Sequence, residues 1–217
     1  MKLSKALILI GLIIFFDQWL KIWIKTHLVI GDEIPVTDWF IIHFTENEGM
    51  AFGMKLPGVW GKLFLSVFRL AAGIGGFYYL NKIVLQKAHW GFITAVSLIL
   101  AGALGNMIDG TFYGMIFTDS TYHVAQVFPQ QGYAGFMQGH VVDMLWFPIY
   151  QGTYPSWFPF WAGEPLEFFR PVFNIADAAI TTGVLIILVF NTVFFKEEGK
   201  PENSASDQVA DTGPTAL

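Results

Sequence analysis

Two aspartates lie in sequence surroundings that are unusual for a carboxylate. Asp143 sits between Val-Val and Met-Leu-Trp, and Asp177 ends the segment Phe-Asn-Ile-Ala-Asp directly before an apolar run. Two carboxylates held together in a partly dry site cannot both ionise easily, so one of them keeps a proton. Such a pair offers a general base to activate water and a general acid to protonate a leaving amine. By spacing alone, Asp17, Asp109 and Asp119 compete for the same role.

Other polar residues near these acids have plausible supporting roles. Asp17 and Lys21 are four positions apart, so on a helix they share a face and can form an ion pair. The same spacing is equally consistent with a charge pair that only anchors a helix end. Asn174 is a predicted N-cap, which makes Asp177 the third residue of the following helix. An acid there also suits the positive end of an ordinary surface helix, but this helix continues directly into apolar sequence.

Several other chemistries are disfavoured by the sequence. The five histidines show no H-E-x-x-H spacing, and there is neither a G-x-S-x-G motif nor a phosphate-binding glycine loop. The absence of cysteine excludes disulfides, a cysteine nucleophile and cysteine-ligated metal. With a net charge of −5 and no basic patch, we expect no nucleic-acid partner. Arg69 is interpreted as a helix residue that extends to the interface, with a functional role as the alternative.

The composition indicates which elements must position these residues. Hydrophobic residues make up 54% of the 217-residue chain and charged residues only 13%. A soluble domain of this size needs a larger charged surface, so the surplus apolar area must face lipid. We therefore predict an all-α membrane protein with a small β element, in one domain over residues 1–196.

Four apolar stretches are long enough to be spanning helices, which need about 20 residues each. They cover about residues 6–24, 63–80, 90–108 and 175–195. The first has no small-residue cleavage site, so it is interpreted as a retained helix, with a signal anchor as the alternative.

Lysines in the short connections predict the orientation. All six lie on one side of a four-span arrangement, which we assign to the cytoplasm with both termini. They are Lys2, Lys5, Lys82, Lys87, Lys196 and Lys200. The other side also carries cations, so the charge asymmetry is modest.

Two longer segments then lie on the outer side. Residues 25–62 contain alternating apolar positions between Gly and Pro, which predicts a small β element on the membrane surface. Residues 109–171 are long and aromatic, which predicts a segment lying against the interface. Residues 197–217 are small and polar, which predicts a disordered cytoplasmic tail.

Five segments, in this order, resemble the lipoprotein signal peptidase (signal peptidase II) family. They are Asp17-x-x-x-Lys21, residues 47–53 (NEGMAFG), residues 102–109 (GALGNMID), residues 139–143 (GHVVD) and residues 173–177 (FNIAD). Each is weak alone, but five in order span almost the whole folded chain.

The resemblance implies an aspartic endopeptidase that cleaves diacylglyceryl-modified prolipoproteins just before the lipidated cysteine. It implies four transmembrane helices in the bacterial inner membrane, an active site near the outer face, and neither metal nor cofactor. It selects Asp143 and Asp177 as the catalytic pair. The residues implied to line or support the site are Asp17, Lys21, Asn47, Gly49, Asn106, Asp109 and Asn174. Lipidated substrates and membrane lipids are the expected partners of a monomer.

The sequence departs from the family pattern in two ways. The family usually has Arg directly after the acid of its third motif, where this chain has Gly110. We expect Arg69 or Arg170 to replace it. Additions at about 115–138 and 147–169 flank Asp143, and we expect them to form an aromatic cover over the catalytic acids, with an exposed loop or a docking surface for a partner as the alternative.

Three alternatives remain at this point. A small transporter or channel would also place acids in helices, although it predicts charges near the bilayer midplane. An inactive homologue would keep the motifs without turnover. A membrane scaffold would leave the acids unexplained.

Overall fold

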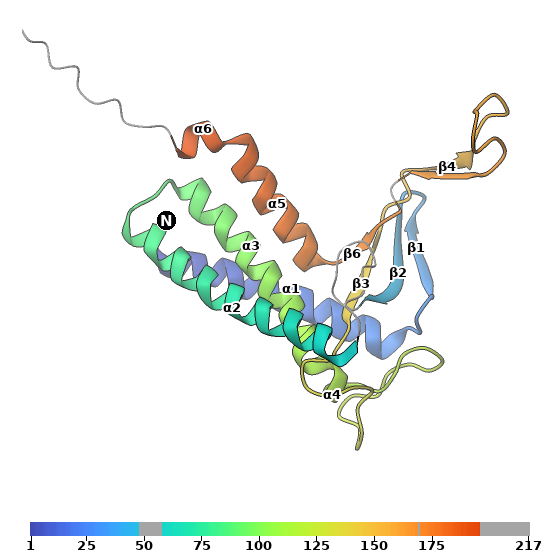
Figure 1. Ribbon diagram of the computed structural model, residues 1–217, viewed down its shortest axis with the longest axis horizontal. Coiled ribbons are helices and arrows are strands. Elements are labelled where there is room, and N and C mark those ends of the chain that lie inside the picture. The colour runs from blue at the N-terminus through green and yellow to red at the C-terminus, as the bar shows by residue number, and fades with distance from the viewer. Residues whose placement is uncertain (48–57, 169, 196–217) are drawn as a thin grey trace, which may run out of the picture.

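A computed structural model describes residues 1–47, 58–168 and 170–195, and it shows a helical bundle with a sheet at one end (Figure 1). The helices are α1 (Leu3–His27), α2 (Gly58–Leu85), α3 (Trp90–Ile108), the π-helical turn η2 (Asp109–Tyr113), α4 (Gly114–Ile116), α5 (Ile175–Val189) and α6 (Asn191–Phe194). The strands are β1 (Glu33–Thr37), β2 (Phe40–Asn47), β3 (Val141–Trp146), β4 (Tyr150–Thr153), β5 (Pro165–Phe168) and β6 (Val172–Phe173). The predicted tail at 197–217 lies outside the described residues.

Helices occupy all four positions predicted from the apolar stretches. Among the described residues, two are long and apolar enough to cross a membrane, Leu3–His27 and the continuous helical segment 90–116. Helix α5 is apolar but shorter, with 15 residues. The outward face of α1 carries large apolar side chains, as expected for a surface in contact with lipid. Exposed examples are Ile8, Leu12, Phe15, Phe16 and Trp19.

Helices α3 and α5 pack with their backbones in contact, and two glycines make this possible. A Cβ added at Gly102 would lie 2.1 Å from the carbonyl oxygen of Ala176. A Cβ at Gly183 would lie 2.6 Å from the carbonyl oxygen of Ala95. Any side chain larger than hydrogen would separate the two helices. The close approach brings the C-terminal end of α3 next to the first turn of α5.

The main sheet has four antiparallel strands in the order β1-β2-β3-β6. The predicted β element at 25–62 is confirmed by β1 and β2. The next strand of the sheet, β3, comes from the long segment between α4 and α5. It pairs Asp143 with Thr45 of β2 and Leu145 with Phe173 of β6. Strand β6 leads directly into α5, so both aspartates are attached to the same sheet (Figure 1).

Two apolar clusters hold the bundle and the sheet together. The first lies between the helices and includes Ile10, Leu80, Ile93 and Leu100. The second joins the C-terminal end of α1 to the sheet, and its buried members include Ile24, Phe44, Phe117, Val142 and Met144. Because Val142 and Met144 flank Asp143, the apolar packing of β3 fixes the position of this carboxylate.

Candidate active site

The two predicted aspartates come from β3 and from the first turn of α5. Asp143 is buried, with 3% of its surface exposed. Asp177 is half-buried, and its backbone N–H donates to the side-chain oxygen of Asn174 at 2.8 Å. The predicted N-cap at Asn174 is therefore confirmed, and capping fixes the start of the helix that carries Asp177.

Three asparagine side chains orient the two carboxyl groups. Asn106 Nδ2 donates to Asp177 Oδ1 at 2.7 Å, and Asn174 Nδ2 donates to Asp143 Oδ1 at 2.7 Å. Asn47, at the end of β2, donates to Asp143 Oδ2. Amide donors hold a carboxyl group in one orientation without adding a charge, so the aspartates are positioned from three different elements.

Burial raises the pKa of Asp143 to about 7, and the nearby charge of Asp177 adds to the effect. Hydrogen bonds from Asn47 and Asn174 and the charge of Lys21 act in the opposite direction. A carboxyl group with this pKa holds its proton near neutral pH, which is the property required of a general acid. The hydrogen bond from Asn174 Nδ2 to Asn106 Oδ1 at 3.2 Å joins the two amides that hold these carboxyl groups, so Asp143 and Asp177 belong to one hydrogen-bonded network.

A buried ion cluster lies directly behind the asparagines. Lys21 Nζ is 2.8 Å from Asp17 Oδ2, 2.7 Å from Asp109 Oδ2 and 3.0 Å from Asn106 Oδ1. The side chain of Lys21 has no exposed surface. The ion pair of Asp17 and Lys21 is thus buried and joined to Asp109 and Asn106, which is more than a charge pair that only anchors a helix end requires.

The same cluster is bonded to the backbones that carry the two aspartates. Asp17 Oδ1 accepts from the N–H of Ala176 at 2.9 Å, and Asp109 Oδ2 accepts from the N–H of Val142 at 3.2 Å. Ala176 precedes Asp177, and Val142 precedes Asp143. The buried acids therefore act as backbone anchors for both candidate catalytic residues.

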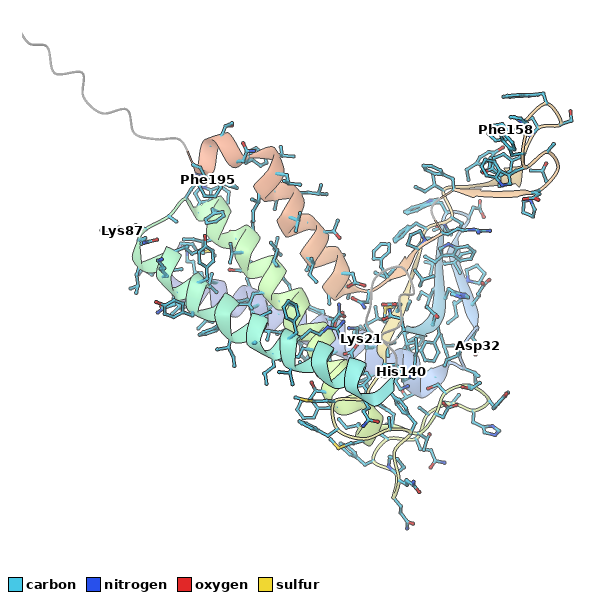
Figure 2. All side chains as sticks on the ribbon, viewed as in Figure 1. Lys21, Asp32, Lys87, His140, Phe158 and Phe195 are labelled. Carbon is cyan, nitrogen blue, oxygen red and sulfur yellow. The ribbon has the colours of Figure 1, made fainter. Side chains whose placement is uncertain are left out.

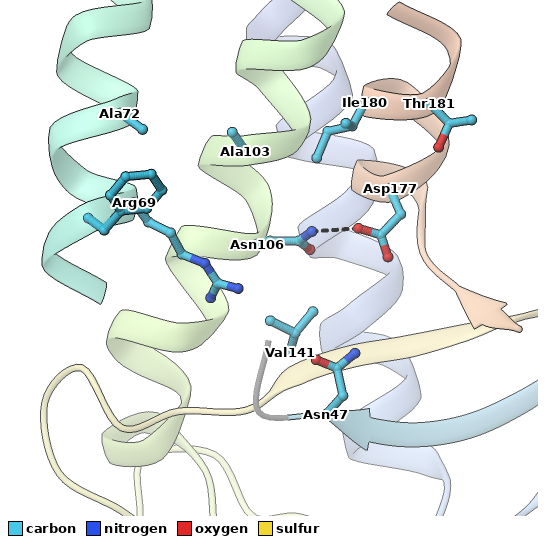
Figure 3. Close-up of a pocket in the computed structure, with 10 residues that line it drawn as sticks. Asn47, Arg69, Ala72, Ala103, Asn106, Val141, Asp177, Ile180 and Thr181 are labelled. Atoms are coloured by element: carbon cyan, nitrogen blue, oxygen red, sulfur yellow. Dashed lines mark hydrogen bonds between the residues drawn. The ribbon is translucent and has the colours of Figure 1, made fainter. Parts of the chain in front are cut away.

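A cavity of about 460 Å³ opens beside Asp177 (Figure 3). Its lining comes from β2, α2, α3, β3 and α5. The lining residues are Asn47, Phe68, Arg69, Ala72, Ala103, Asn106, Val141, Asp177, Ile180 and Thr181. Polar groups gather at one end, and apolar side chains form the walls between the helices, which suits a substrate with both peptide and apolar parts.

Arg69 extends from α2 toward this polar end of the cavity (Figure 3). A Cβ added at Gly110 would lie 3.6 Å from Arg69 Nη1, so the guanidinium occupies the space beside the residue without a side chain. Arg170 instead lines a separate cavity with Tyr154 and Trp161. Of the two arginines considered from the sequence, only Arg69 lines the cavity that contains Asp177.

The expected cover over the acids is wrong for the residues that the structure describes. No lining residue of the cavity comes from 115–138 or from 147–169. The segment 115–138 packs on the C-terminal end of α1, where the N–H of Ala125 donates to the carbonyl of Lys25 at 3.0 Å. The segment 147–169 contains the hairpin β4–β5 (Figure 1). Within each addition the backbone also pairs with itself, at Phe117 with Val127 in the first and across β4–β5 in the second.

Other predicted residues have different outcomes. Asn47, Asn106, Asp109, Asn174, Asp17 and Lys21 all join the network described above. Gly49 lies outside the described residues. Asp119 is exposed and accepts from the N–H of Thr121 at 2.8 Å, so it does not belong to the pair.

Sequence reasoning missed Gln18. Its Nε2 donates to Asp109 Oδ1 at 2.8 Å, and its Oε1 accepts from the hydroxyl of Tyr113 at 3.0 Å. A glutamine beside Asp17 within an apolar run was the available signal.

Sequence reasoning also missed a second buried ion pair, between Lys25 and Glu46. His140, which is labelled in Figure 2, lies next to this pair. Lys25 Nζ also donates to Ser120 Oγ at 2.9 Å, and His140 Nδ1 lies 3.2 Å from Glu46 Oε2. Burial opposes the ionisation of Glu46, but the hydrogen bond to His140 and the charge of Lys25 outweigh it and lower its pKa. Lys25 follows Lys21 by four positions, a spacing that places both on one helix face.

Solved structures with the same fold define the class of protein. One, titled a bacterial membrane enzyme structure by the in meso method at 2.3 Å resolution, is similar with a TM-score of 0.58 and 24% identity. The similarity covers 91% of this chain and 94% of that one. A second bacterial membrane enzyme structure, at 1.9 Å, gives 0.54 and 25% identity, over 86% of this chain and 92% of that one. The fold is that of a membrane enzyme.

Residues 9–194 match the sequence model of the family described as Signal peptidase (SPase) II, and the chain belongs to this family. A lipoprotein signal peptidase of Porphyromonas gingivalis is 46% identical, covering 95% of this chain and 92% of the relative. One from Amoebophilus asiaticus is 32% identical, covering 82% and 73%. The resemblance inferred from the five motifs is confirmed, and the protein is a peptidase.

Proposed function

We propose that this peptidase removes signal peptides from lipid-modified prolipoproteins, cutting just before the diacylglyceryl cysteine, with Asp143 and Asp177 as its catalytic pair. The observation that carries the proposal is the hydrogen-bonded chain that joins buried Asp143 through Asn174 and Asn106 to Asp177, which lines the cavity. Family membership and the lipoprotein signal peptidase relatives support the substrate class. Both aspartates and the cavity belong to one chain, which supports a monomeric enzyme.

The two acids have different proposed roles. Asp177 lines the cavity and, as a carboxylate, accepts a proton from a water molecule that attacks the scissile carbonyl carbon. Asp143 begins the reaction protonated and gives its proton to the amine that leaves when the C–N bond breaks. The hydrogen bond from Asn106 fixes Asp177 for this transfer.

The remaining cavity residues suit a lipidated peptide. Phe68, Ala72 and Ile180 provide an apolar wall between α2 and α5 for the signal helix or an acyl chain. Arg69 brings a positive charge to the polar end, where it can bind a carbonyl oxygen of the substrate. An apolar enclosure also excludes water, which strengthens these polar contacts.

The rate of cleavage is expected to fall as the pH rises through about 7. The pKa of Asp143 is about 7, so above this pH Asp143 is ionised and the pair loses its proton donor. Replacing Asn47 with alanine removes a hydrogen bond that favours ionised Asp143, so its pKa should rise and the alkaline limb should move to higher pH. The measurement is kcat/KM against pH for both proteins. A shift of the limb to lower pH in Asn47→Ala would contradict the assignment of Asp143 as the acid.

We also propose that α1, α2, α3 and α5 all span the bacterial inner membrane, with both termini in the cytoplasm. Lys87 lies at the end of the bundle opposite the sheet (Figure 2), and Lys2 and Lys5 line the same pocket as Lys87. The positive-inside tendency supports a cytoplasmic location for that end. The site at the sheet end would then open near the outer face.

Thiol labelling of intact cells tests this orientation, because the chain has no native cysteine. A cysteine at Ser4 is expected to resist an impermeant reagent until the cells are opened. A cysteine at Gln131, in the exposed outer addition, is expected to react at once. Labelling of Ser4→Cys in intact cells would reverse the topology.

A further inference from the structure

The hairpin β4–β5 extends away from both the helices and the site. Figure 2 shows Phe158 at the far end of the molecule from Lys21. Tyr150 pairs with Phe168 and Thr153 with Pro165, and beyond them the N–H of Tyr154 donates to the carbonyl of Glu164 at 2.9 Å. The hairpin is thus an ordered projection, and the catalytic mechanism gives it no role.

The tip of the hairpin is aromatic and without charge. The sequence contains no Asp, Glu, Lys or Arg between Ile149 and Gly163. Rings of Tyr154, Phe158 and Trp161 pack on one another, with centroids 5.0 Å apart for the first pair and 5.8 Å for the second. This small cluster supports Trp157 and Phe160, which are 77% and 80% exposed. Exposure of two large aromatic side chains to water is unfavourable, so their presentation on an ordered base indicates a binding surface.

The position of the hairpin relative to the helices indicates what covers these rings. The sheet and hairpin extend sideways from the ends of the helices where α5 begins, across the helix axes (Figure 1). A bilayer around the helices lies across the same axes, so a sideways projection from their ends stays at the level of its surface. Only six residues separate Phe168 from Ile175, where the apolar helix begins, and this short link holds the base of the hairpin near the hydrocarbon boundary.

An aromatic stack lies on the main sheet close in sequence to the base of the hairpin, since Phe147 comes three residues before β4. The ring of Phe147 stacks on Phe173 at 5.6 Å and on Phe40 at 4.9 Å between centroids. Trp39, which is 61% exposed, extends the same stack. Next to the tip, Arg170 and Glu164 line a cavity of about 330 Å³ with Tyr154 and Trp161. A cation for phosphate and a carboxylate for an amine, both beside aromatic rings, suit a zwitterionic lipid headgroup.

We propose that the hairpin β4–β5 is a lateral membrane anchor, whose Trp157 and Phe160 insert into the headgroup region of the outer leaflet. Tryptophan and tyrosine favour this region because their rings are apolar and their polar atoms stay hydrated. The anchor fixes the sheet, and with it Asp143, at a set height above the helices. It does not depend on the assignment of the catalytic pair.

Site-directed fluorescence tests the proposal without an activity measurement. Single cysteines at Trp157 and at Tyr122 are labelled with an environment-sensitive dye in full-length protein, in vesicles of phosphatidylethanolamine and phosphatidylglycerol. Tyr122 is the matched reference, because it is 83% exposed and lies in the other addition beside polar residues. The dye at 157 is expected to show several-fold weaker quenching by iodide than the dye at 122, together with quenching by lipids that carry a nitroxide near the headgroup.

Absence of nitroxide quenching at 157 would overturn the proposal, whatever the reference position shows. If the dye at 157 is protected from iodide in native membrane vesicles but not in vesicles of pure lipid, the rings are covered by a protein partner. That result would also overturn the proposal. Phe160→Cys provides a second probe if Trp157→Cys unfolds at a lower temperature than the parent protein. Arg170→Gln is expected to weaken the nitroxide quenching at 157 if the adjacent cavity holds a lipid headgroup.

Discussion

Replacing Asp143 or Asp177 with asparagine is expected to reduce cleavage of a lipidated prolipoprotein by roughly 10²- to 10⁴-fold, the usual contribution of a proton-transfer group. An amide cannot accept the proton of the attacking water or supply one to the leaving amine. The measurement is signal-peptide release by each purified variant in lipid. Near-parental turnover by either variant would remove that residue from the pair.

Asp177→Asn disturbs the hydrogen bonds of the site less than Asp143→Asn does. Asp177 Oδ1 accepts from Asn106, and an asparagine at this position can keep its oxygen on that donor. Asp143 accepts amide donors at both oxygens, from Asn174 and Asn47, so Asp143→Asn puts an NH₂ group against one of them. Unfolding temperatures should therefore be measured for both variants. Asp119→Asn is the control, since it changes an exposed aspartate outside the site.

Replacing Lys21 with methionine is expected to lower the free energy of unfolding by about 3–5 kcal/mol, as for other buried ion pairs that lose one partner. Methionine has a similar length but no charge. The substitution leaves Asp17 and Asp109 close together and buried, with 1% and 0% of their side-chain surface exposed. It also removes the donor to Asn106, which orients Asp177.

Unfolding in detergent, followed by circular dichroism or by dye accessibility, measures this loss. Lys82→Met is the matched control, because Lys82 is exposed on the last turn of α2 and should tolerate the change. The double variant Asp17→Asn, Lys21→Met is expected to recover part of the loss, since one uncompensated charge is gone. Equal stability of Lys21→Met and Lys82→Met would show that Lys21 does not neutralise the buried acids.

The local features of the site could be predicted from the sequence because they depend on neighbouring residues. The cap at Asn174 and the ion pair of Asp17 and Lys21 follow from spacings of three and four positions on a helix. The choice of Asp143 as the partner of Asp177 does not follow from local spacing, because the two residues belong to elements that are joined through sheet pairing. The family resemblance supplied that pairing, and the structure shows the asparagines that produce it.

The long-range features were harder to predict for the same reason. Strand β3 pairs with β2, almost a hundred residues earlier, and nothing local in residues 141–146 specifies this partner. The residues of 147–169 were correctly recognised as aromatic, but aromatic composition gives no direction in space. Turn and pairing geometry decided that they form a projecting hairpin and not a cover.

In the four-span arrangement proposed above, the glycine contacts between α3 and α5 are expected to determine how the site responds to the thickness of the bilayer. Apolar helices adapt to a thinner or thicker bilayer mainly by tilting. With Gly102 against Ala176 and Gly183 against Ala95, α3 and α5 have no layer of side chains between them that could deform, so they tilt as one rigid pair. Asn106 and Asp177 sit on opposite members of this pair and keep their hydrogen bond during the tilt. In the proposed four-span arrangement, hydrophobic mismatch is therefore absorbed mainly at the contacts of α2 with this pair, because Asp17 and Lys21 tie α1 to Ala176 and Asn106. The hydrogen bond between Asn106 and Asp177 is expected to be insensitive to the thickness of the bilayer.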